Sequence, residues 1–451
     1  MIQLLVYQHW KSELFIFVLF GEMNAILLLD PVTEWIPVVQ EAKQRSLVII
    51  AVQLSPIPDR LVRFVPSARD LLDNGGVHYV MDQRNRDCYE SVRAVQLLLK
   101  KEDLKLQAVI PLSETAVDYA DIFAAMLDLP YHNPLSLVTA RRDKGLMKEA
   151  VLRSGIRVAA FSRVHACHEV QSFMEEQYLD FPVVIKTPQG FSTTDVFICT
   201  DIQQISDALT SIVGRMGPDG RTVPEALVEE YIDGTEFAVN MMAFQGNITI
   251  TDVWKYSKTD KARYCQADIC NPNSEELFHV IEYCKRVAFA VGIRYGAAHV
   301  EVKAELDYDG VYVDPCMIEI GARLSGGRKA SMTQASLNGE WNPFSALIDV
   351  HSGILPSFPK DFVPKQFVRH IFLPVENSGY VEDISLDTSK LKTLHSHVML
   401  VHKGDFIEET TDITSCAGFI WLVGQNIDVE EDTQFVRENF SIVLNANSLR
   451  I

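Results

Sequence analysis

Residues 296–327 read GAAHVEVKAELDYDGVYVDPCMIEIGARLSGG, and this stretch decides the fold. Its two halves alternate apolar and polar residues, as half-buried strands do, and an Asp-Gly pair separates them. The pattern predicts an antiparallel hairpin with strands over 297–305 and 311–320. Folding about that turn brings Glu301 and Glu319 to roughly the same level.

Two neighbouring carboxylates repel each other unless a proton or a cation lies between them. Mg²⁺ prefers oxygen ligands, takes few of them from protein and completes its shell with water and phosphate. Glu301 and Glu319 therefore indicate a magnesium site, and two solvent-facing glutamates on strand edges are the alternative. Pro315 predicts a bulge in the second strand. His299 is either a base near the substrate, a partner of the metal ligands or a buried core histidine.

The second strand runs into Arg323 and the glycines Gly326 and Gly327. A planar guanidinium at this place can hold a carboxylate or an acyl phosphate. The glycines would let a substrate approach the backbone amides closely. A plain turn followed by a surface arginine is the alternative.

Two lysines upstream are candidate phosphate ligands. Lys186 ends an apolar strand and precedes a loop of small residues over 187–195, whose amides could contact phosphate. Lys144 lies near the start of a predicted helix, where a cation is unfavourable with the helix dipole and indicates an anionic partner. A solvated lysine is the alternative in each case. The loop does not match the Walker A pattern, so we exclude a P-loop.

Residues 228–236 read VEEYIDGTE, which predicts a strand, a glycine turn and a returning acidic residue. Backbone groups of such a segment can face a base edge, and a glutamate can accept both ribose hydroxyls. The alternative is an acidic turn on an acidic protein.

Further upstream, apolar runs over 24–30, 47–53 and 108–112 alternate with helical patterns, which predicts a doubly wound parallel α/β domain. Apolar-alternating segments at 226–232, 236–243 and 247–255 suggest an antiparallel sheet, and the polar stretch 256–273 reads as a long functional loop. The expected organisation is an extension, an N-terminal α/β domain, two central lobes and a strand-rich C-terminal lobe, at 1–22, 23–135, 136–230, 231–359 and 360–451.

The composition is that of a globular protein, with 47% hydrophobic residues among 451 and a net charge of −19. The negative charge disfavours nucleic acid and anionic membrane surfaces as partners. The eight cysteines form no CxxC pair, so we expect free thiols in a reducing cytosol. The apolar run at 13–20 is too short to span a bilayer, and we expect a cytoplasmic protein.

Five segments in order resemble the ATP-grasp superfamily: DKGLMKEAVLRSGI, FPVVIKTPQG, LVEEYIDGTEF, GAAHVEV and MIEIGARLSGG. The resemblance covers about residues 24–350. The last segment most resembles the carboxylate–amine ligase branch, which includes L-amino-acid ligases. The implied fold has a doubly wound α/β domain, two lobes that clamp ATP with antiparallel sheets, and a strand-rich C-terminal lobe.

The resemblance also implies residue roles. In it, Lys144, Lys186 and Thr193 contact the ATP phosphates, Glu229, Glu230, Tyr231 and Ile232 line the adenine pocket, and Glu236 binds ribose. Glu301 and Glu319 hold Mg²⁺, for which Mn²⁺ is a substitute. Arg323 stabilises the transferred phosphoryl group, and Lys186 is the second catalytic residue. Gly326, Gly327 and His299 lie beside the substrate.

Two positions depart from the superfamily pattern. Asp195 stands where the phosphate loop often has glycine, which restricts the backbone and adds negative charge. Gly321 stands where many members have a metal-binding Asn. This branch often lacks that Asn, so the two glutamates and phosphate oxygens would have to suffice.

The implied activity is ATP-dependent ligation of a small-molecule carboxylate, expected to be an amino acid, to an amine. It proceeds through an acyl phosphate and releases ADP and phosphate. The alternatives are transfer of an amino acid to a carrier-protein thiol or a peptide acceptor, and a nucleotide-binding protein without activity. Family analogy alone suggests a homodimer.

Overall fold

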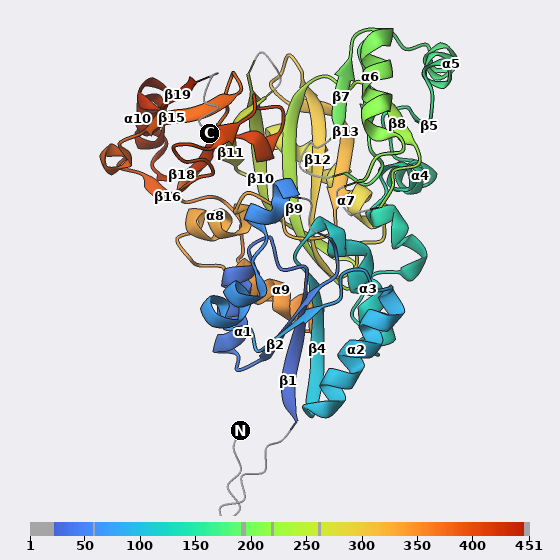
Figure 1. The fold of residues 1–451 in the computed structure, drawn as a ribbon, viewed down its shortest axis with the longest axis vertical. Helices are drawn as coiled ribbons and strands as arrows, with labels where there is room; N and C mark the ends of the chain where they lie inside the picture. Colours follow the sequence, from blue (N-terminus) through green and yellow to red (C-terminus); the bar gives the residue numbers. More distant parts are fainter. Residues whose placement is uncertain (1–21, 57–58, 191–194, 218–220, 260–262, 446–451) are drawn as a thin grey trace, which may run out of the picture.

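The computed structural model describes residues 22–56, 59–190, 195–217, 221–259 and 263–445. Thr193 and nearly all of the expected N-terminal extension therefore lie outside the described residues. Figure 1 shows four groups of elements: a parallel sheet at the bottom, a large antiparallel sheet above it, a small sheet with helices at one side and a strand-rich group at the other.

The N-terminal sheet is parallel, with strand order β3-β2-β1-β4. Its elements are β1 Met23–Leu29, α1 Trp35–Gln44, β2 Val48–Gln53, β3 Tyr79–Asp82, α2 Cys88–Lys101, β4 Leu104–Pro111 and α3 Val117–Met126. Strands β1 and β2 are continuously apolar because both of their faces are buried. The predicted doubly wound domain is confirmed.

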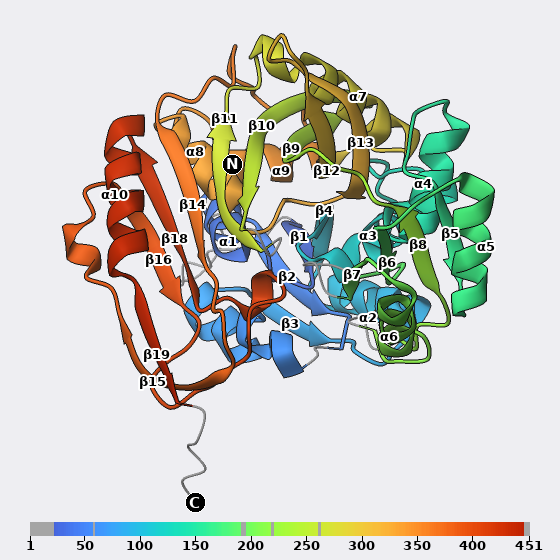
Figure 2. The ribbon, with the colours of Figure 1, turned by 90° about the horizontal axis from the view of Figure 1, so that it is seen from above.

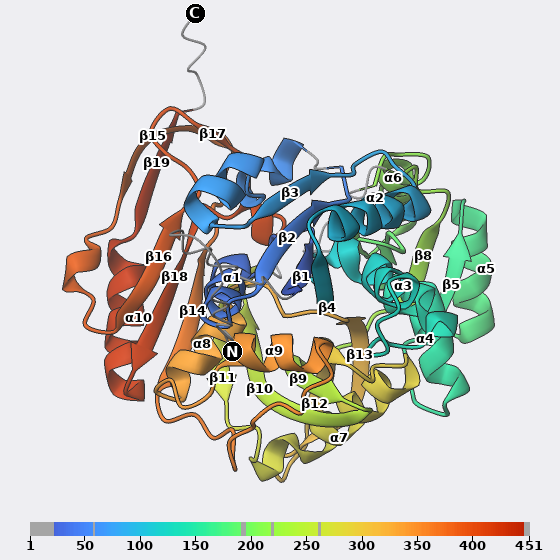
Figure 3. The ribbon, with the colours of Figure 1, turned by 90° about the horizontal axis from the view of Figure 1, so that it is seen from below.

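One face of this sheet is covered by a helix from much later in the chain. Helix α9 Pro343–His351 begins at Asn342, whose side chain accepts hydrogen bonds from the amides of Phe344 and Ser345. Phe344 and Leu347 of α9 share a buried cluster with β1, so this helix fastens the N-terminal sheet to the rest of the chain. Figure 3 shows α9 beside α1.

The small sheet is antiparallel, with order β5-β8-β6-β7. Its elements are α4 Lys144–Arg153, β5 Phe161–Val164, α5 Cys167–Gln177, β6 Val183–Lys186, β7 Val196–Cys199, α6 Ile202–Ile212 and β8 Ala226–Glu230. The segment at 226–232 was expected in one sheet with 236–255. That expectation is wrong, because β8 pairs with β5 and β6 instead.

The large sheet has eight antiparallel strands in the order β13-β12-β9-β10-β11-β14-β18-β16. Its first part consists of β9 Thr235–Phe244, β10 Asn247–Lys258, β11 Tyr264–Cys270, β12 Gly296–Leu306 and β13 Tyr312–Gly321, with helix α7 Phe278–Ala290 packed on β12 and β13. The predicted functional loop over 256–273 is wrong. Most of it belongs to β10 and β11, which pair with each other.

The C-terminal elements extend this sheet. They are α8 Lys329–Ser336, β14 Phe367–Leu373, β15 Gly379–Ser385, β16 Leu394–Met399, β17 Phe406–Ile407, β18 Gly418–Gly424, α10 Asn426–Asn439 and β19 Ser441–Asn445. Figure 2 shows β14, β18 and β16 continuing from β11, with α10 outside them. Strands β17, β15 and β19 form a separate small sheet.

Short helical turns complete the chain: η1 Asp59–Phe64, η2 Asp70–Gly75, η3 Glu114–Ala116, η4 Leu135–Leu137, η5 Thr139–Arg141, η6 Glu275–Leu277, η7 Thr388–Lys390 and η8 Ile413–Ser415.

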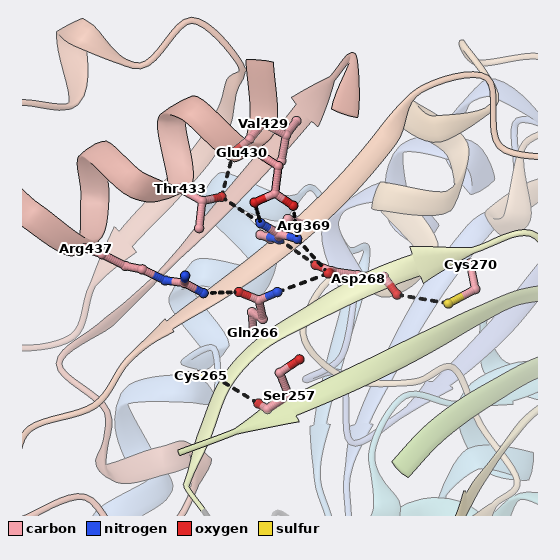
Figure 4. A network of polar contacts seen from close by, with 10 residues as sticks. All are labelled: Ser257, Cys265, Gln266, Asp268, Cys270, Arg369, Val429, Glu430, Thr433 and Arg437. Carbon is pink, nitrogen blue, oxygen red and sulfur yellow. Dashed lines mark hydrogen bonds and ion pairs between the residues drawn. The ribbon is translucent and has the colours of Figure 1, made fainter. Parts of the chain in front are cut away.

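A polar network fixes the seam between β11 and β14 (Figure 4). The guanidinium of Arg369 donates to both carboxylate oxygens of Asp268, at 2.7 and 2.8 Å, and to both of Glu430, at 2.7 and 2.8 Å. Such forked pairs are among the strongest side-chain hydrogen bonds. Because β11, which precedes residue 359, pairs with β14, which follows it, the C-terminal strands belong to the same sheet as the central ones. The domain limits given above stay a prediction.

No helix in the described part of the chain is long and apolar enough to cross a membrane. All eight cysteines are free thiols, as expected.

Candidate functional site

The predicted hairpin forms, and its register brings the two candidate metal ligands together. Glu301 of β12 is the direct partner of Glu319 of β13, and the register shifts immediately beyond them. Glu236 of β9 lies near the same point, because it is the register partner of Lys303, two residues after Glu301 on β12. The expected bulge in the second strand is present.

Electrostatics set the two glutamates apart. Burial and the neighbouring charge of Glu319 raise the pKa of Glu301. Burial alone would also raise the pKa of Glu319, but the positive charges of Lys144 and then Lys186 together lower that pKa. The pKa values of these adjacent carboxylates are shifted in opposite directions, and a divalent cation between them would relieve their mutual repulsion. Within the described residues no group of three or more His, Cys, Asp and Glu side chains is arranged to hold a metal.

Lys144 is buried at the first position of α4, where the Asp143 side chain caps the helix. Its Nζ lies 2.8 Å from Glu319 Oε2 and donates to the carbonyl of Gly190 at 2.6 Å. The helix start thus points its lysine at the carboxylate pair and at the loop after β6. That loop ends at Asp195, whose φ of 55° is a left-handed conformation that glycine adopts more readily.

Lys186 at the end of β6 is also buried, and its Nζ lies 2.9 Å from Glu229 Oε2. The same oxygen lies 3.3 Å from the Nζ of Lys148, one turn after Lys144 on α4. Burial opposes ionisation of Glu229, but the two lysines lower its pKa overall. Burial lowers the pKa of Lys148. Two amines therefore share one carboxylate oxygen in the interior.

The connection from β8 to β9 holds the expected nucleotide residues. Glu230 exchanges hydrogen bonds with the backbone of Ala160, its amide donating at 2.8 Å and its Oε2 accepting at 3.0 Å. Lys303 donates to the carbonyl of Ile232 at 2.7 Å, and its amine lies 4.7 Å from the ring centre of Tyr231. These contacts anchor the chain between the small and large sheets.

Glu236 is buried at the start of β9. Its carboxylate accepts hydrogen bonds from Lys258 Nζ at 2.7 Å and from the Tyr264 hydroxyl at 2.5 Å. Both partners come from the stretch 256–273, where the sequence predicts a functional loop. The end of β10 and the start of β11 therefore border the site.

Arg323 follows β13 and is held by Glu114, which accepts from its Nε at 2.8 Å. The Nη1 of Arg323 also donates to the carbonyl of Leu324 at 2.7 Å. Gly327 adopts a left-handed φ of 72°, and its carbonyl accepts from the indole of Trp421 at 2.9 Å. Gly326 has open space where a side chain would stand.

His299 is buried beside Arg323, and burial followed by that positive charge lowers its pKa to about 4. It pairs in register with Gly321, and a Cβ at Gly321 would lie 2.5 Å from the His299 ring. The histidine therefore fills the space that a side chain at 321 would need, which accounts for the glycine there.

Three buried residues near the site escaped the sequence reasoning: Lys148, Lys329 and His370. Lys329 begins α8, and burial, opposed by Glu301, lowers its pKa to about 8. His370 comes from β14, stacks on Trp421 and has no hydrogen-bond partner among the described residues. Lys148 could have been found, because its position one turn after Lys144 places it on the same helix face. Nothing in the sequence marks the other two.

Comparison with known proteins agrees with this architecture. A model of the ATP-grasp domain matches residues 179–331. Dapdiamide A synthase from Enterobacter agglomerans is 28% identical over 346 residues, which cover 73% of this chain and 78% of that protein.

Solved structures show the same fold. The L-amino acid ligase from Bacillus licheniformis superposes with a TM-score of 0.74 at 19% identity, covering 94% of this chain and 99% of that one. The biotin carboxylase domain of the Hydrogenobacter thermophilus 2-oxoglutarate carboxylase, solved with MgADP and bicarbonate, gives a TM-score of 0.63 at 13% identity over 93% and 90% of the two chains. By the match of the domain model, residues 179–331 belong to the ATP-grasp superfamily, and the parallel N-terminal sheet and the antiparallel sheets give the whole chain the fold of the solved structures named above.

Proposed function

We propose that the protein is an ATP- and Mg²⁺-dependent ligase that joins the carboxylate of one small molecule, an amino acid, to the amine of another. The observation that carries the proposal is the register pair Glu301 and Glu319, with the buried Lys144 against it. Similarity to dapdiamide A synthase and to an L-amino acid ligase supports this reaction class. We place the reaction in the cytoplasm.

The nucleotide would lie between the small β5-β8-β6-β7 sheet and the large sheet. Lys144 and Lys186 converge on this space from α4 and β6, and both are available to phosphate oxygens if they exchange their present carboxylate partners. Backbone groups of residues 229–232 would face the adenine, and Glu236 would accept the ribose hydroxyls. Thr193, proposed for the phosphates, lies outside the described residues.

The residues present fit a divalent metal. Glu301 and Glu319 offer oxygen donors at one level of the sheet, and their mutual repulsion opposes ionisation of both in its absence. Mg²⁺ held by these two carboxylates, or Mn²⁺ in its place, would offset the negative charge that develops during phosphoryl transfer. Lys144, 2.8 Å from Glu319, would add a second positive charge for the phosphates beside that carboxylate.

The chemistry needs no side-chain nucleophile. An oxygen of the substrate carboxylate attacks the γ-phosphorus of ATP, the bond to ADP breaks, and an acyl phosphate forms. The amine then attacks the acyl carbon, loses a proton, and expels phosphate, which leaves an amide. In this proposal Arg323, held by Glu114, would stabilise the transferred phosphoryl group, and Gly326, with open space at its Cα, would give the substrate close access to the backbone.

The test is release of ADP and phosphate across pairs of amino acids with ATP and Mg²⁺, followed by mass spectrometry of the product. We expect amide formation that depends on both amino acids. Phosphate release that requires a carrier protein or a peptide would favour the thiol or peptide acceptor instead. Tight ATP binding without release in any of these assays would favour a nucleotide-binding protein.

A further inference from the structure

Lys329 is a buried cation that has no role in the account so far. It is 4% exposed and occupies the first position of α8, directly after the turn 326–328. Its amine lies over the rings of Tyr256 and Trp254, 5.0 and 5.7 Å from their centres, and forms no hydrogen bond or ion pair within the described residues. A cation is unfavourable at a helix start, and burial without a partner adds to the cost.

The nearby carboxylates do not serve as partners of this lysine. Burial lowers the pKa of Lys329, and the charges of Glu301 and Asp252 oppose that shift, but neither carboxylate forms an ion pair with it in the described structure. Glu301 is already proposed for the metal. Asp252 is satisfied by neutral donors, which are the side chains of Asn240, Thr251 and Trp254. The charge of Lys329 is therefore available to a ligand.

The amine of Lys329 can be reached through the turn before the helix. Gly327 is exposed, and a Cβ built on it would lie 3.5 Å from Lys329 Nζ. Because glycine has no side chain, this approach to the amine stays open. Among the described residues, the partnerless side-chain atoms that are shut off from solvent include both ring nitrogens of the neighbouring His370, but not the amine of Lys329. A small anion at this turn could therefore touch the amine.

The start of α8 is held in place from the N-terminal sheet. Glu34, in the loop after β1, accepts hydrogen bonds from the amide and the hydroxyl of Ser331 at 3.1 and 2.6 Å. A carboxylate is favourable at this end of a helix, so the contact fixes the turn that carries Lys329. The backbone carbonyl of Lys329 accepts from the Thr333 hydroxyl at 2.9 Å. The lysine is thus positioned before any ligand arrives.

Lys329 approaches the carboxylate pair from the side opposite Lys144. Strands β13, β12, β9 and β10 follow one another in the large sheet. Lys144 contacts Glu319 on β13, whereas Lys329 lies over Tyr256 and Trp254 on β10. An anion bound by Lys329 would therefore lie away from the proposed phosphate lysine, next to the glycine turn that the proposed function gives to the substrate.

We propose that Lys329 is a further catalytic residue, which binds the substrate carboxylate that becomes activated. The inference rests on the proposed function and adds a residue to it. The ammonium group would hold one carboxylate oxygen while the other attacks the γ-phosphorus of ATP. An O–P bond forms, the bond to ADP breaks, and Lys329 keeps its protons throughout. Its charge offsets that of the carboxylate in a place where little water competes.

The test replaces Lys329 by Met in the full-length protein. The best amino-acid pair from the release assay is used, and fragment masses of the product identify the member that supplied the acyl group. The KM of that acid should rise at least about tenfold, since a charge-assisted contact is lost, while the KM of ATP stays within about threefold of native. Lys101→Met, with a side chain 77% exposed, is the matched control and should keep both KM values.

Stability separates a binding role from a structural one. The neighbours Trp254 and Tyr256 belong to a buried apolar cluster, and replacing a buried charge by an apolar side chain of similar length is often neutral or stabilising. The urea midpoint of Lys329→Met should therefore equal or exceed the native one. Lys329→Gln should show the same rise in the KM of the acid. A midpoint lowered in both variants would show that Lys329 supports the fold, and would overturn the proposal.

The outcomes also separate this inference from the proposed function. Native amide formation combined with a native KM for the acid in Lys329→Met would overturn the role of Lys329 alone. A raised KM for ATP with a native KM for the acid would assign Lys329 to the nucleotide and overturn the carboxylate contact. Absence of phosphate release with every amino-acid pair would overturn the proposed function, and the role of Lys329 would fall with it.

Discussion

The ammonium group of Lys144 lies 2.8 Å from the Oε2 atom of Glu319. This contact joins the start of α4 to the end of β13, and so joins the small sheet's helix to the large sheet. Lys144, the proposed phosphate ligand, and Glu319, the proposed metal ligand, are therefore neighbours in the structure.

Glu319→Gln should lower turnover at least about tenfold while the fold is kept, because a metal ligand is lost and Gln is nearly isosteric. Phosphate release measures the effect, and circular dichroism checks the fold. Glu305→Gln on the exposed part of β12 is the control and should retain native turnover. Native turnover in Glu319→Gln would exclude it as a metal ligand.

Arg323→Ala should lower kcat by about a hundredfold or more, as removal of a charge-stabilising group does, and leave ATP affinity within a few-fold of native. Calorimetry with ATP and steady-state kinetics separate the two quantities. Arg157→Ala, whose side chain is 42% exposed and pairs with Asp314, serves as the control. Lost ATP affinity together with normal turnover at saturation would assign Arg323 to nucleotide binding instead.

Lys148→Met and Lys186→Met should have different consequences although both lysines contact Glu229. Lys148 is completely buried and also lies against the carbonyls of Met317 and Ile318, so its loss should cost about 1–3 kcal/mol of unfolding free energy. Lys186→Met should instead reduce ATP affinity at least about tenfold. Denaturant unfolding and ATP titration measure the two effects. Equal losses of ATP affinity in the two variants would show that Lys148 also binds phosphate.

His370 provides a prediction for pH. Burial and the positive charges of Lys329 and Arg328 keep its pKa well below the usual value of 6.5. Below pH 6.5 the His370 imidazole binds a proton in the unfolded chain but not in the folded protein. The folded protein therefore loses stability as the pH falls through 6.5. The neighbouring rings of Phe372 and Phe419 would accommodate an aromatic replacement.

In His370→Phe the stability difference between pH 7.5 and pH 5.5 should therefore shrink by about 1.4 kcal/mol, the value for one proton over one pH unit. Urea unfolding at the two pH values measures it. His402→Gln, with a side chain 80% exposed, should keep the native pH dependence. An unchanged pH dependence in His370→Phe would show that His370 takes up its proton equally in the folded and the unfolded protein, which would contradict the lowered pKa.

Much of the fold could be predicted because many strands and turns are determined by the residues within them. The continuous apolar run of β1 predicts a strand buried on both faces, and the Asp-Gly turn fixes the register of Glu301 with Glu319. The place of helix α9 against β1 could not be predicted, since only packing between distant segments decides which sheet a helix covers.

The polar stretch at 256–273 shows the limit of local reading. Its polar residues have partners from far along the chain, such as Arg369 for Asp268 and Arg437 for Gln266, which allow β11 to form within a sheet. The same limit applies to the site. Lys329 and His370 are defined by burial against strands that the sequence alone does not bring together.

The most direct test of the account follows the oxygen atoms of the activated carboxylate. An amino acid labelled with ¹⁸O in both carboxylate oxygens is incubated with its partner amino acid, ATP and Mg²⁺, and the phosphate and nucleotide are analysed by mass spectrometry. If the carboxylate attacks the γ-phosphate, the released phosphate carries one ¹⁸O, the amide retains the other, and unlabelled ADP accumulates. Unlabelled phosphate, or ¹⁸O recovered in AMP, would contradict the acyl phosphate and with it the central claim.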